Sequence, residues 1–434
     1  MAERKRIVVV GGGAAGIGLC RSLARRFRDT HDVTLIDRNR THVWKPLLHE
    51  VAAGVLDPNL EEVGYGGHAA RWGYRFFRGA LEKIDRERQV VTTSPLLDED
   101  GDVLLDRHEI AYDWLILAFG GVSNDFGIPG VRDHALFLED RGQADRFRQK
   151  LLNACLRANA RRAEGEDATV PIVIVGGGAT GVELSAELVH AARALNSYGL
   201  ESFPSDAMRI TLLEAGPRLL PALGEDVVAK VEDELTSIGV DVRTGAKVTE
   251  VRADAVSVEG MEDLPATLVL WATGIRGDPA VADMSDLELS KADRILVNPD
   301  LRTVTDDHIL AIGDCAHCEP PGQDGPIPPR AQAAHQMADH AVEVIAAVEA
   351  GRTPEPFTYR DHGALVSLSR FATVGSLMGN LAGGRVAIEG RLARAAYLSL
   401  YRLHIISMHG WLRGLARLAA KQLGRAVRPQ IKLH

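Results

Sequence analysis

The stretch Ile7–Gly16, with the sequence IVVVGGGAAG, decides the fold of this chain. Its four apolar residues predict a buried strand, and Gly11, Gly13 and Gly16 follow with G-x-G-x-x-G spacing. In a Rossmann-type unit the first glycine permits a tight turn, the second lets a pyrophosphate approach the backbone, and the third lets helix pack on strand. We expect a helix from Ala14 to Phe27, whose N-terminus offers free N–H groups and a positive dipole to the phosphates.

The residues after this helix complete the unit. A second strand is predicted over 33–36 and ends at Asp37, 21 residues beyond Gly16. A carboxylate at that place accepts hydrogen bonds from a ribose. A glycine triplet alone is weak evidence, but strand, triplet, helix, strand and acid in this order predict a dinucleotide site.

The same arrangement recurs in residues 171–214. A strand over 171–175 leads into three glycines with the same spacing, a helix is predicted over 183–194, and a strand over 209–213 ends at Glu214. The glycines are Gly176, Gly178 and Gly181. Residues 196–207 lengthen the unit and are interpreted as an inserted loop.

Glu214 indicates which nicotinamide cofactor the second unit binds. A carboxylate there bonds the adenosine ribose and repels a 2′-phosphate, which favours NADH over NADPH. Arg218 lies nearby in the sequence and could offset this repulsion, so NADPH stays open at this point.

A strand beyond the second unit indicates how the domains are connected. Residues 309–314, ILAIGD, are a predicted strand that ends in Gly313 and Asp314. In flavoproteins with two dinucleotide units, an aspartate at this place binds the ribityl chain of FAD. The FAD domain must then be discontinuous in sequence. The predicted strands 112–120 and 268–274 end in Gly120 and Gly274, where the chain is expected to cross between domains.

These patterns predict an α/β fold with two Rossmann-like domains, the NADH domain being inserted into the FAD domain. We expect the FAD domain to comprise residues 1–140 and 290–350, and the NADH domain to comprise 165–285. Residues 153–169, rich in Ala, Arg and Glu, are interpreted as a linker, and 355–434 as a C-terminal region that binds membrane.

The cysteines argue against several classes of protein. Four cysteines are too few for a disulfide scaffold, and a reducing cytoplasm fits them best. Residues 38–54 contain none, which argues against a disulfide reductase or a peroxide reductase with a redox cysteine there. Cys315 and Cys318 form a C-x-x-C motif, which we interpret as small buried residues, with a redox or metal role as the alternative. No obvious set of zinc ligands accompanies them, so we expect no metal.

Charge is distributed unevenly along the chain. Residues 391–434 contain nine Lys or Arg and no Asp or Glu, so the net charge of −9 leaves −18 for the preceding residues. An acidic body is repelled by nucleic acid and by anionic lipid, whereas the basic segment is not. The apolar run after the N-terminus is too short for a signal peptide, and no window of about 18 apolar residues predicts a membrane-spanning helix.

The basic segment has the periodicity of an amphipathic helix. One face is apolar, with Trp411, Leu412, Leu415, Leu418, Ala419 and Leu423. The other is cationic, with Arg413, Arg417, Lys421, Arg425 and Arg428. Such a helix lies in the bilayer interface with its cations on anionic lipid. The alternative is a helix packed on the protein body or on a second copy of the chain.

Together these features resemble the type II (single-subunit) NADH:quinone oxidoreductases. Beyond the glycine turns, the resemblance rests on four stretches: residues 42–54 (HVWKPLLHEVAAG), 180–188 (TGVELSAEL), 328–336 (PPRAQAAHQ) and 397–410 (YLSLYRLHIISMHG). The resemblance implies a glutathione-reductase-like arrangement of the two domains. It also implies a peripheral enzyme on the cytoplasmic side of the plasma membrane and a possible homodimer.

The resemblance also implies roles for individual residues. Glu183 would lie at the nicotinamide and assist proton movement, although it could simply stabilise the N-terminal turn of its helix. Gln332 would meet the quinone headgroup beside the flavin, with Gln336 in the same motif, although the amide of Gln332 could simply cap backbone groups at the helix N-terminus. His335 could donate protons but is interpreted as a packed or surface histidine. Lys45 would face either the flavin or solvent.

The expected function is therefore hydride transfer from NADH to FAD, followed by transfer of two electrons to a membrane quinone without proton pumping. Three alternatives stay open. A soluble NADH-dependent reductase of a ferredoxin- or rubredoxin-type protein would ignore lipid. A sulfide:quinone oxidoreductase would need cysteines near the flavin. A redox sensor would bind NADH but turn over slowly.

Overall fold

The computed structural model describes residues 3–323, 325–368, 372–379, 384–389, 405, 406 and 408–425. The chain divides into two compact units, which we call unit 1 and unit 2. Unit 1 comprises Met1–Trp44, Glu61–Val122 and Ile275–Asp361. Unit 2 comprises Lys45–Leu60, Ser123–Gly274 and His362–His434. Two of the crossings between units lie after Val122 and after Gly274, close to the ends of the predicted strands 112–120 and 268–274.

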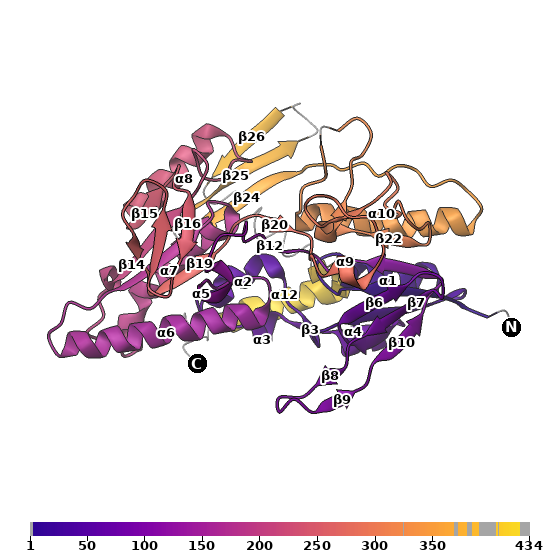
Figure 1. Ribbon diagram of the computed structural model, residues 1–434, viewed down its shortest axis with the longest axis horizontal. Coiled ribbons are helices and arrows are strands. Elements are labelled where there is room, and N and C mark those ends of the chain that lie inside the picture. The colour runs from indigo at the N-terminus through magenta and orange to yellow at the C-terminus, as the bar shows by residue number, and fades with distance from the viewer. Residues whose placement is uncertain are drawn as a thin grey trace. The chain divides into compact units, whose positions relative to one another are not determined.

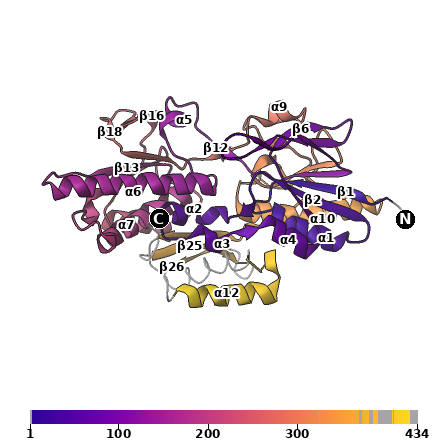
Figure 2. The ribbon, with the colours of Figure 1, turned by 90° about the horizontal axis from the view of Figure 1, so that it is seen from below.

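Unit 1 is built on a five-stranded parallel sheet with the order β22-β11-β1-β2-β5. Figure 1 labels its edge strand β22, and Figure 2 labels β1 and β2. The strands are β1 (Lys5–Val10), β2 (His31–Asp37), β5 (Arg75–Arg78), β11 (Trp114–Leu117) and β22 (Ile309–Ala311). Ile7 in the central strand pairs with Val33 on one side and Trp114 on the other. Because β22 pairs with β11 although unit 2 intervenes in the sequence, unit 1 is discontinuous, as the position of ILAIGD predicts.

Helices α1 (Gly16–Arg26), α4 (Tyr65–Trp72) and α10 (Ala331–Glu349) belong to the same unit, and α1 contacts β2, α4 and α10. Ile17 and Leu23 of α1 are fully buried against these neighbours. The other elements are β3 (Thr41–His42), β4 (Val63–Gly64), β6 (Leu81–Asp85), β7 (Val90–Thr93), β8 (Leu96–Leu97), β9 (Val103–Leu105), β10 (His108–Ala111), β20 (Ile275–Arg276), α9 (Val281–Met284), β21 (Ile295–Leu296), η4 (Gly313–Cys315) and β23 (Ala316–His317). Two further elements span unit junctions, α3 (Pro58–Glu61) and β12 (Val122–Ser123).

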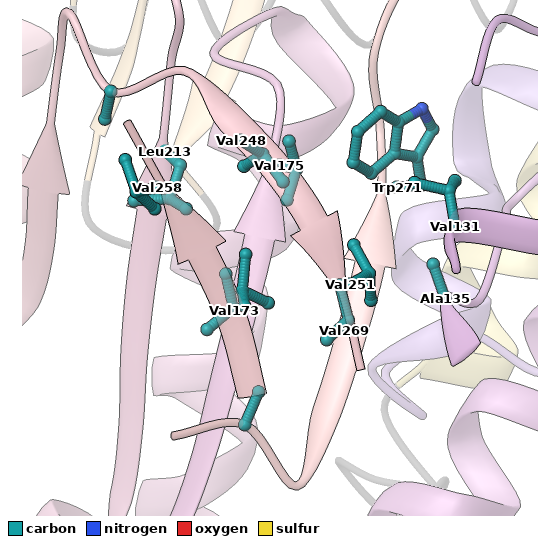
Figure 3. Packing of buried hydrophobic residues seen from close by; sticks show 13 residues of the cluster. Val131, Ala135, Val173, Val175, Leu213, Val248, Val251, Val258, Val269 and Trp271 are labelled. Atoms are coloured by element: carbon teal, nitrogen blue, oxygen red, sulfur yellow. The ribbon is translucent and has the colours of Figure 1, made fainter. Parts of the chain in front are cut away.

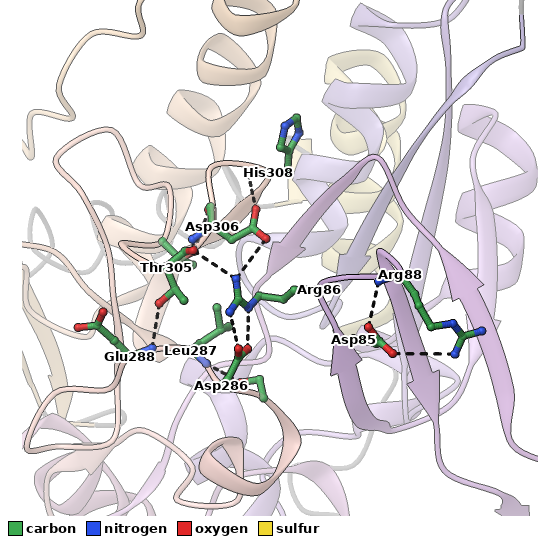
Figure 4. Close-up of polar contacts among 11 residues, drawn as sticks. Asp85, Arg86, Arg88, Asp286, Leu287, Glu288, Thr305, Asp306 and His308 are labelled. Atoms are coloured by element: carbon green, nitrogen blue, oxygen red, sulfur yellow. Dashed lines mark hydrogen bonds and ion pairs between the residues drawn. The ribbon is translucent and has the colours of Figure 1, made fainter.

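One arginine fastens the antiparallel ribbon of β6 and β7 to the segment before β22. The guanidinium of Arg86 donates to both carboxylate oxygens of Asp286 and, from Nη1, to the carbonyl oxygen of Thr305 at 3.3 Å (Figure 4). The Arg86 guanidinium lowers the pKa of the Asp286 carboxyl, chiefly through these hydrogen bonds. Residues far apart in sequence are thereby held together within unit 1.

Unit 2 repeats this architecture with a four-stranded parallel sheet of order β15-β14-β13-β19. The strands are β13 (Val170–Val175), β14 (Met208–Leu213), β15 (Val240–Arg243) and β19 (Leu268–Trp271). β13 pairs with β14 and β19 as β1 pairs with β2 and β11 in unit 1. The two-domain Rossmann-like fold predicted from the glycine turns is thus confirmed.

One hydrophobic cluster of unit 2 lies between this sheet and the antiparallel strands β16 (Val248–Val251), β17 (Ala255–Val258) and β18 (Leu264–Pro265). Val173 and Val175 of β13 pack with Val248 and Val258 in this cluster, and Trp271 closes one side of it beside Val131 (Figure 3). The remaining elements of the unit up to residue 274 are η1 (Lys45–Leu47), α2 (Leu48–Ala52), α5 (Val131–His134), α6 (Arg141–Ala163), α7 (Ala179–Leu195), η2 (Asn196–Tyr198), η3 (Ser205–Ala207) and α8 (Glu225–Ser237).

The predicted linker over 153–169 is wrong for most of its length. Helix α6 runs to Ala163 and lies along β13 (Figure 2). Asp140 caps its N-terminus by accepting a hydrogen bond from the N–H of Gln143 at 2.8 Å. A stripe of apolar residues is buried: Ala144, Phe147, Leu151, Ala154, Cys155 and Ala158. Ala, Arg and Glu are strong helix formers, so a composition that looked like a linker belongs to a packed helix.

The C-terminal part of unit 2 contains an antiparallel sheet of β24 (Gly363–Leu368), β25 (Ala372–Gly379) and β26 (Gly384–Glu389). Helix α12 (Trp411–Arg425) begins at the residue where the amphipathic pattern begins. Residues 391–404 and 426–434 of the basic segment, including Arg428, lie outside the described residues. Among the described helices, none is long and apolar enough to cross a membrane.

Candidate functional site

Of the three glycines in the G-x-G-x-x-G pattern of the first turn, two exclude a side chain and the third is open. Gly11 has φ 102°, and a Cβ there would lie 2.5 Å from the carbonyl oxygen of Ala118. A Cβ on Gly16 would lie 1.8 Å from the carbonyl oxygen of Gly11. A Cβ on Gly13, by contrast, would meet nothing within 4 Å. The turn therefore leaves room for a ligand at the glycine where a pyrophosphate approaches in Rossmann-type units.

Asp37 is held in place by hydrogen bonds, one of them from the first glycine turn. Its Oδ2 accepts a hydrogen bond from the N–H of Gly12 at 2.7 Å, and its Oδ1 accepts one from the N–H of Asn39 at 2.7 Å. The carboxylate at the end of β2 is thus fixed directly beside the glycine turn.

The second turn has nearly the same geometry. Gly176 has φ 117°, and its Cβ would lie 2.5 Å from the carbonyl oxygen of Ala272. A Cβ on Gly181 would lie 2.1 Å from the carbonyl oxygen of Gly176, and one on Gly178 would meet nothing within 4 Å. The second turn therefore excludes side chains, and leaves open space, at the same positions of the glycine pattern as the first turn.

Backbone N–H groups hold the carboxylate of Glu214 in place, as they hold that of Asp37. Its Oε2 accepts from the N–H of Gly177 at 2.6 Å, and its Oε1 accepts from the N–H of Gly216 at 2.7 Å. Arg218 donates to the carbonyl oxygens of Leu223 and Pro221 at 3.2 and 3.1 Å. Because these backbone bonds engage its guanidinium, Arg218 gives little support to a 2′-phosphate site.

The helices behind both turns have N-termini suited to phosphate. The N-cap residues of α1 and α7 are Ala15 and Gly178, and neither end has a hydrogen bond from an N-cap side chain. The N–H groups of a first helical turn need partners from outside the helix, and a phosphate supplies them. The residues present at both turns thus fit a dinucleotide.

Glu183 lies on the buried side of α7, in unit 2, with 6% of its surface exposed. Its Oε1 accepts a hydrogen bond from the backbone N–H of Ser367 in β24 at 3.0 Å. Its Oε2 lies 3.6 Å from Nδ1 of His49 in α2. Burial lowers the pKa of His49 to about 4, so this imidazole is neutral at pH 7. The Ser367 N–H and the neutral His49 imidazole therefore lie on the two oxygens of this buried carboxyl group.

The two predicted quinone glutamines contact one backbone group in unit 1. Nε2 of Gln332 donates to the carbonyl oxygen of Arg360 at 3.0 Å, and Nε2 of Gln336 donates to the same oxygen at 2.8 Å. The N–H of Arg360 donates to Oε1 of Gln336 at 3.0 Å. Gln336 therefore uses both ends of its amide on the chain itself, whereas Gln332 uses its nitrogen.

His335, between these glutamines, is packed against other groups of unit 1. Its ring stacks on Trp44 with 5.6 Å between centroids. Burial lowers its pKa, opposed by a hydrogen bond to the backbone of Ala14 in the first glycine turn. His335 thus links α10 to that turn.

The other predicted cofactor residues lie close to strand ends. Gly120 has φ 83°, and the carbonyl oxygen of Gly274 accepts from the N–H of Asn124 at 2.9 Å. The N–H of Gly313 contacts the sulfur of Met337 at 3.2 Å, which sets η4 and its Asp314 against α10. Lys45 is exposed in η1 and is the first residue of the segment Lys45–Leu60, which belongs to unit 2.

The C-x-x-C residues are buried free thiols. Burial raises the pKa values of Cys315 and Cys318 to about 12, so neither is a thiolate at pH 7. No group of three potential metal-ligating residues occurs in the part of the chain that the structure describes. The burial and protonation of Cys315 and Cys318 support their interpretation as small buried residues.

Sequence reasoning missed the residues that hold the turns. A Cβ on Gly12 would lie 2.4 Å from the ring of Tyr65, and the carbonyl oxygen of Gly12 accepts from that residue's hydroxyl and from His42. A Cβ on Gly177 would lie 2.5 Å from Leu219. The signal that could have found them is the extra glycine in each GGG run, at a position that the G-x-G-x-x-G pattern leaves free.

Comparison with known proteins adds a family assignment to this geometry. The profile of the family described as pyridine nucleotide-disulphide oxidoreductase matches residues 5–338. A type II NADH:quinone oxidoreductase of Haemophilus influenzae is 41% identical over 445 residues, covering 99% of this chain and 100% of that protein. One from Staphylococcus aureus is 30% identical over 392 residues, covering 89% and 92%. The structure of NDH2 from Plasmodium falciparum in complex with NADH matches with a TM-score of 0.81 at 18% identity, over 99% of this chain and 100% of that one.

Proposed function

We propose that this chain oxidises NADH and delivers the electrons through FAD to a quinone, because it belongs to the type II NADH:quinone oxidoreductases and to the pyridine nucleotide-disulphide oxidoreductase family. The observation that carries the proposal is the pair of matching turns, each with an open glycine, an uncapped helix N-terminus and an acid fixed on the turn. FAD supplies the ring that accepts hydride and releases electrons.

We assign FAD to the turn of unit 1 and NADH to the turn of unit 2. Asp37 and Glu214 would each bind the adenosine ribose of their own dinucleotide, through carboxylates that the turns already orient. Asp314, at the end of the strand that completes the unit 1 sheet, supports FAD there. The remaining FAD residues would be Gly11, Gly13, Ala14, Gly16, Lys45, Gly120 and Gly313, and the remaining NADH residues Gly176, Gly178, Gly181, Glu183 and Gly274.

Glu183 is proposed to hold and pass a proton during turnover. Its carboxyl group is buried, and the Ser367 N–H fixes one oxygen while neutral His49 faces the other. A buried carboxyl oriented in this way can exchange a proton with a bound ligand without rearranging.

Quinone recognition is assigned chiefly to Gln332. In the described part of the chain its amide engages Arg360 through the nitrogen, while Gln336 is bound at both ends. We therefore expect Gln332 to meet the quinone and Gln336 to hold the Arg360 segment in place beside it.

Peripheral attachment to an anionic membrane surface is also proposed, through residues 391–434 on the cytoplasmic side. Trp411 and Leu412 of α12 are 65% and 69% exposed, beside the cationic Arg413. An exposed apolar face with flanking cations suits a bilayer interface. A homodimer, formed through the same region, is the alternative use of this surface.

The test is an anaerobic titration of the purified protein with NADH, followed by addition of an electron acceptor. We expect the visible flavin bands to bleach with NADH and to return on adding a short-chain quinone. Ferredoxin, rubredoxin and a small disulfide serve as comparison acceptors. Reoxidation by a protein or disulfide acceptor but not by quinone would overturn the proposed acceptor, and a colourless protein would overturn the whole proposal.

A further inference from the structure

One carbonyl group in the first glycine turn receives two hydrogen bonds from side chains. The carbonyl oxygen of Gly12 lies 2.9 Å from the hydroxyl of Tyr65 and 3.0 Å from Nδ1 of His42. Because a carbonyl oxygen only accepts, the proton of His42 must be on Nδ1. The hydroxyl of Tyr65 also lies 3.4 Å from Oδ2 of Asp37, so this side chain reaches both the turn and the predicted ribose acid.

Both donors are buried and neutral. Tyr65 is 2% exposed and His42 is 3% exposed. Burial and the nearby Asp37 raise the pKa of Tyr65, and burial lowers the pKa of His42 to about 4. At neutral pH both groups therefore remain uncharged hydrogen-bond donors, which suits a structural contact rather than proton transfer.

Short backbone pairings bring the two donors to the same place. His42 ends β3, Val63 opposite it begins β4, and Tyr65 follows β4 as the first residue of α4. The N–H of Tyr65 also donates to the carbonyl oxygen of Arg40 at 3.0 Å. The donors thus approach Gly12 from ordered elements, and the clash of a Cβ at Gly12 with the Tyr65 ring shows how closely they fit.

The second turn has no equivalent side-chain donors in the described structure. The corresponding carbonyl oxygen, that of Gly177, accepts from the backbone N–H of Leu220 at 2.9 Å. Leu220 has φ 46°, in the left-handed region that leucine rarely adopts. The second turn is therefore held by a strained loop, whereas the first is held by a helix and a strand.

We infer that Tyr65 and His42 are positioning residues that pre-form the first turn and thereby keep FAD permanently bound, while the second turn is held loosely enough for NADH to exchange. The inference rests on the proposed assignment of FAD to unit 1. A turn that is already ordered before the ligand arrives avoids the entropic cost of ordering on binding, and so binds more tightly. Both residues act on the backbone of the turn, through the carbonyl oxygen of Gly12.

The shared acceptor makes a specific prediction. Removing either donor alone leaves the Gly12 carbonyl with one hydrogen bond, whereas removing both leaves a buried carbonyl without these partners, which costs more than two separate bonds. We expect the dissociation constant of FAD to rise about threefold in Tyr65→Phe and in His42→Leu, and about 30-fold or more in the double variant.

The experiment measures FAD binding rather than turnover. Flavin is removed from the full-length protein, and its re-binding is followed by flavin fluorescence, together with the temperature at which the holoprotein releases FAD. His42→Asn keeps a donor near the position of Nδ1 and should restore most of the affinity lost in His42→Leu. The dissociation constant of NADH for flavin-loaded protein should change less than twofold in all variants.

Tyr74→Phe is the matched control. Tyr74 is a second buried tyrosine of unit 1, 6% exposed, and its hydroxyl bonds Nδ1 of His68 at 2.7 Å rather than the turn. If Tyr74→Phe weakened FAD as much as Tyr65→Phe, or if the double variant bound FAD like the wild type, the inference would be wrong while the proposed function would stand. Wild-type protein that bound no FAD would overturn both.

Discussion

Single residues in this protein prepare binding groups before any ligand is present. Asp37 and Glu214 each accept a hydrogen bond from the middle glycine of their own turn, at 2.7 and 2.6 Å. Each carboxylate is therefore held in place by backbone N–H groups. Glu214 uses both oxygens on backbone N–H groups, so its carboxylate is held beside the second glycine turn.

We predict that Glu214→Gln reduces the preference for NADH over NADPH, measured as the ratio of kcat/KM values, by about tenfold. Glutamine keeps an oxygen for the Gly177 N–H but removes the charge that repels a 2′-phosphate. Glu262→Gln, at an exposed acid of the same unit, is the control and should leave the ratio unchanged. An unaltered ratio in Glu214→Gln would place cofactor selection elsewhere.

At the scale of elements, helices that share one composition serve different purposes. Helix α6 is rich in Ala and Arg and buries an apolar stripe within unit 2. Helix α12 has a similar composition, yet Trp411, Leu412 and Leu415 are exposed, while Gly414 lies against Ile406. Periodicity identifies the apolar face of α12, but it does not reveal whether such a face is covered.

Replacing Leu412 and Leu415 by glutamate should weaken binding to vesicles that contain phosphatidylglycerol. The change removes apolar area and adds negative charge at an anionic surface, so we expect a loss of at least tenfold in partitioning by vesicle flotation. Flavin content should not change. Leu156→Glu, at a leucine of α6 that is 53% exposed, is the matched control. Equal loss in both variants, or none in either, would contradict a specific role for α12.

At the scale of the whole molecule, the two units share the same arrangement of sheet and glycine turn. Each unit has a parallel sheet in which an inner strand leads into a glycine turn. Each unit also has one histidine, His42 in unit 1 and His49 in unit 2, that burial keeps neutral at pH 7. The pKa values of His42 and His49 fall to about 4, from about 6.5 in an unfolded chain. Both units are therefore sensitive to acid for the same physical reason.

Between pH 6.5 and 4 the unfolded chain binds protons at these histidines and the folded chain does not, so stability must fall as the pH falls through this window. We predict a loss of about 2 kcal/mol in unfolding free energy for each histidine between pH 7.5 and 5. Urea unfolding of the holoprotein at both pH values measures it. His49→Gln should flatten the dependence, and His134→Gln, at an exposed histidine, should not. A variant lacking His49 with the wild-type pH dependence would refute the prediction.

The sequence alone determined the two parallel sheets, the glycine turns and the acids that end β2 and β14, because local spacing and periodicity encode these features. It also predicted the discontinuity of unit 1, since ILAIGD follows the second turn in chain order.

Only the tertiary structure decided which side chains hold the site. Tyr65 reaches Gly12, Ser367 reaches Glu183, and Arg360 receives both glutamines, all across long stretches of sequence. Local periodicity carries no information on such partners, because they are selected by how the elements pack. The same reason explains why α6 looked like a linker: its helix is stabilised by burial against β13 and its neighbours, which composition does not display.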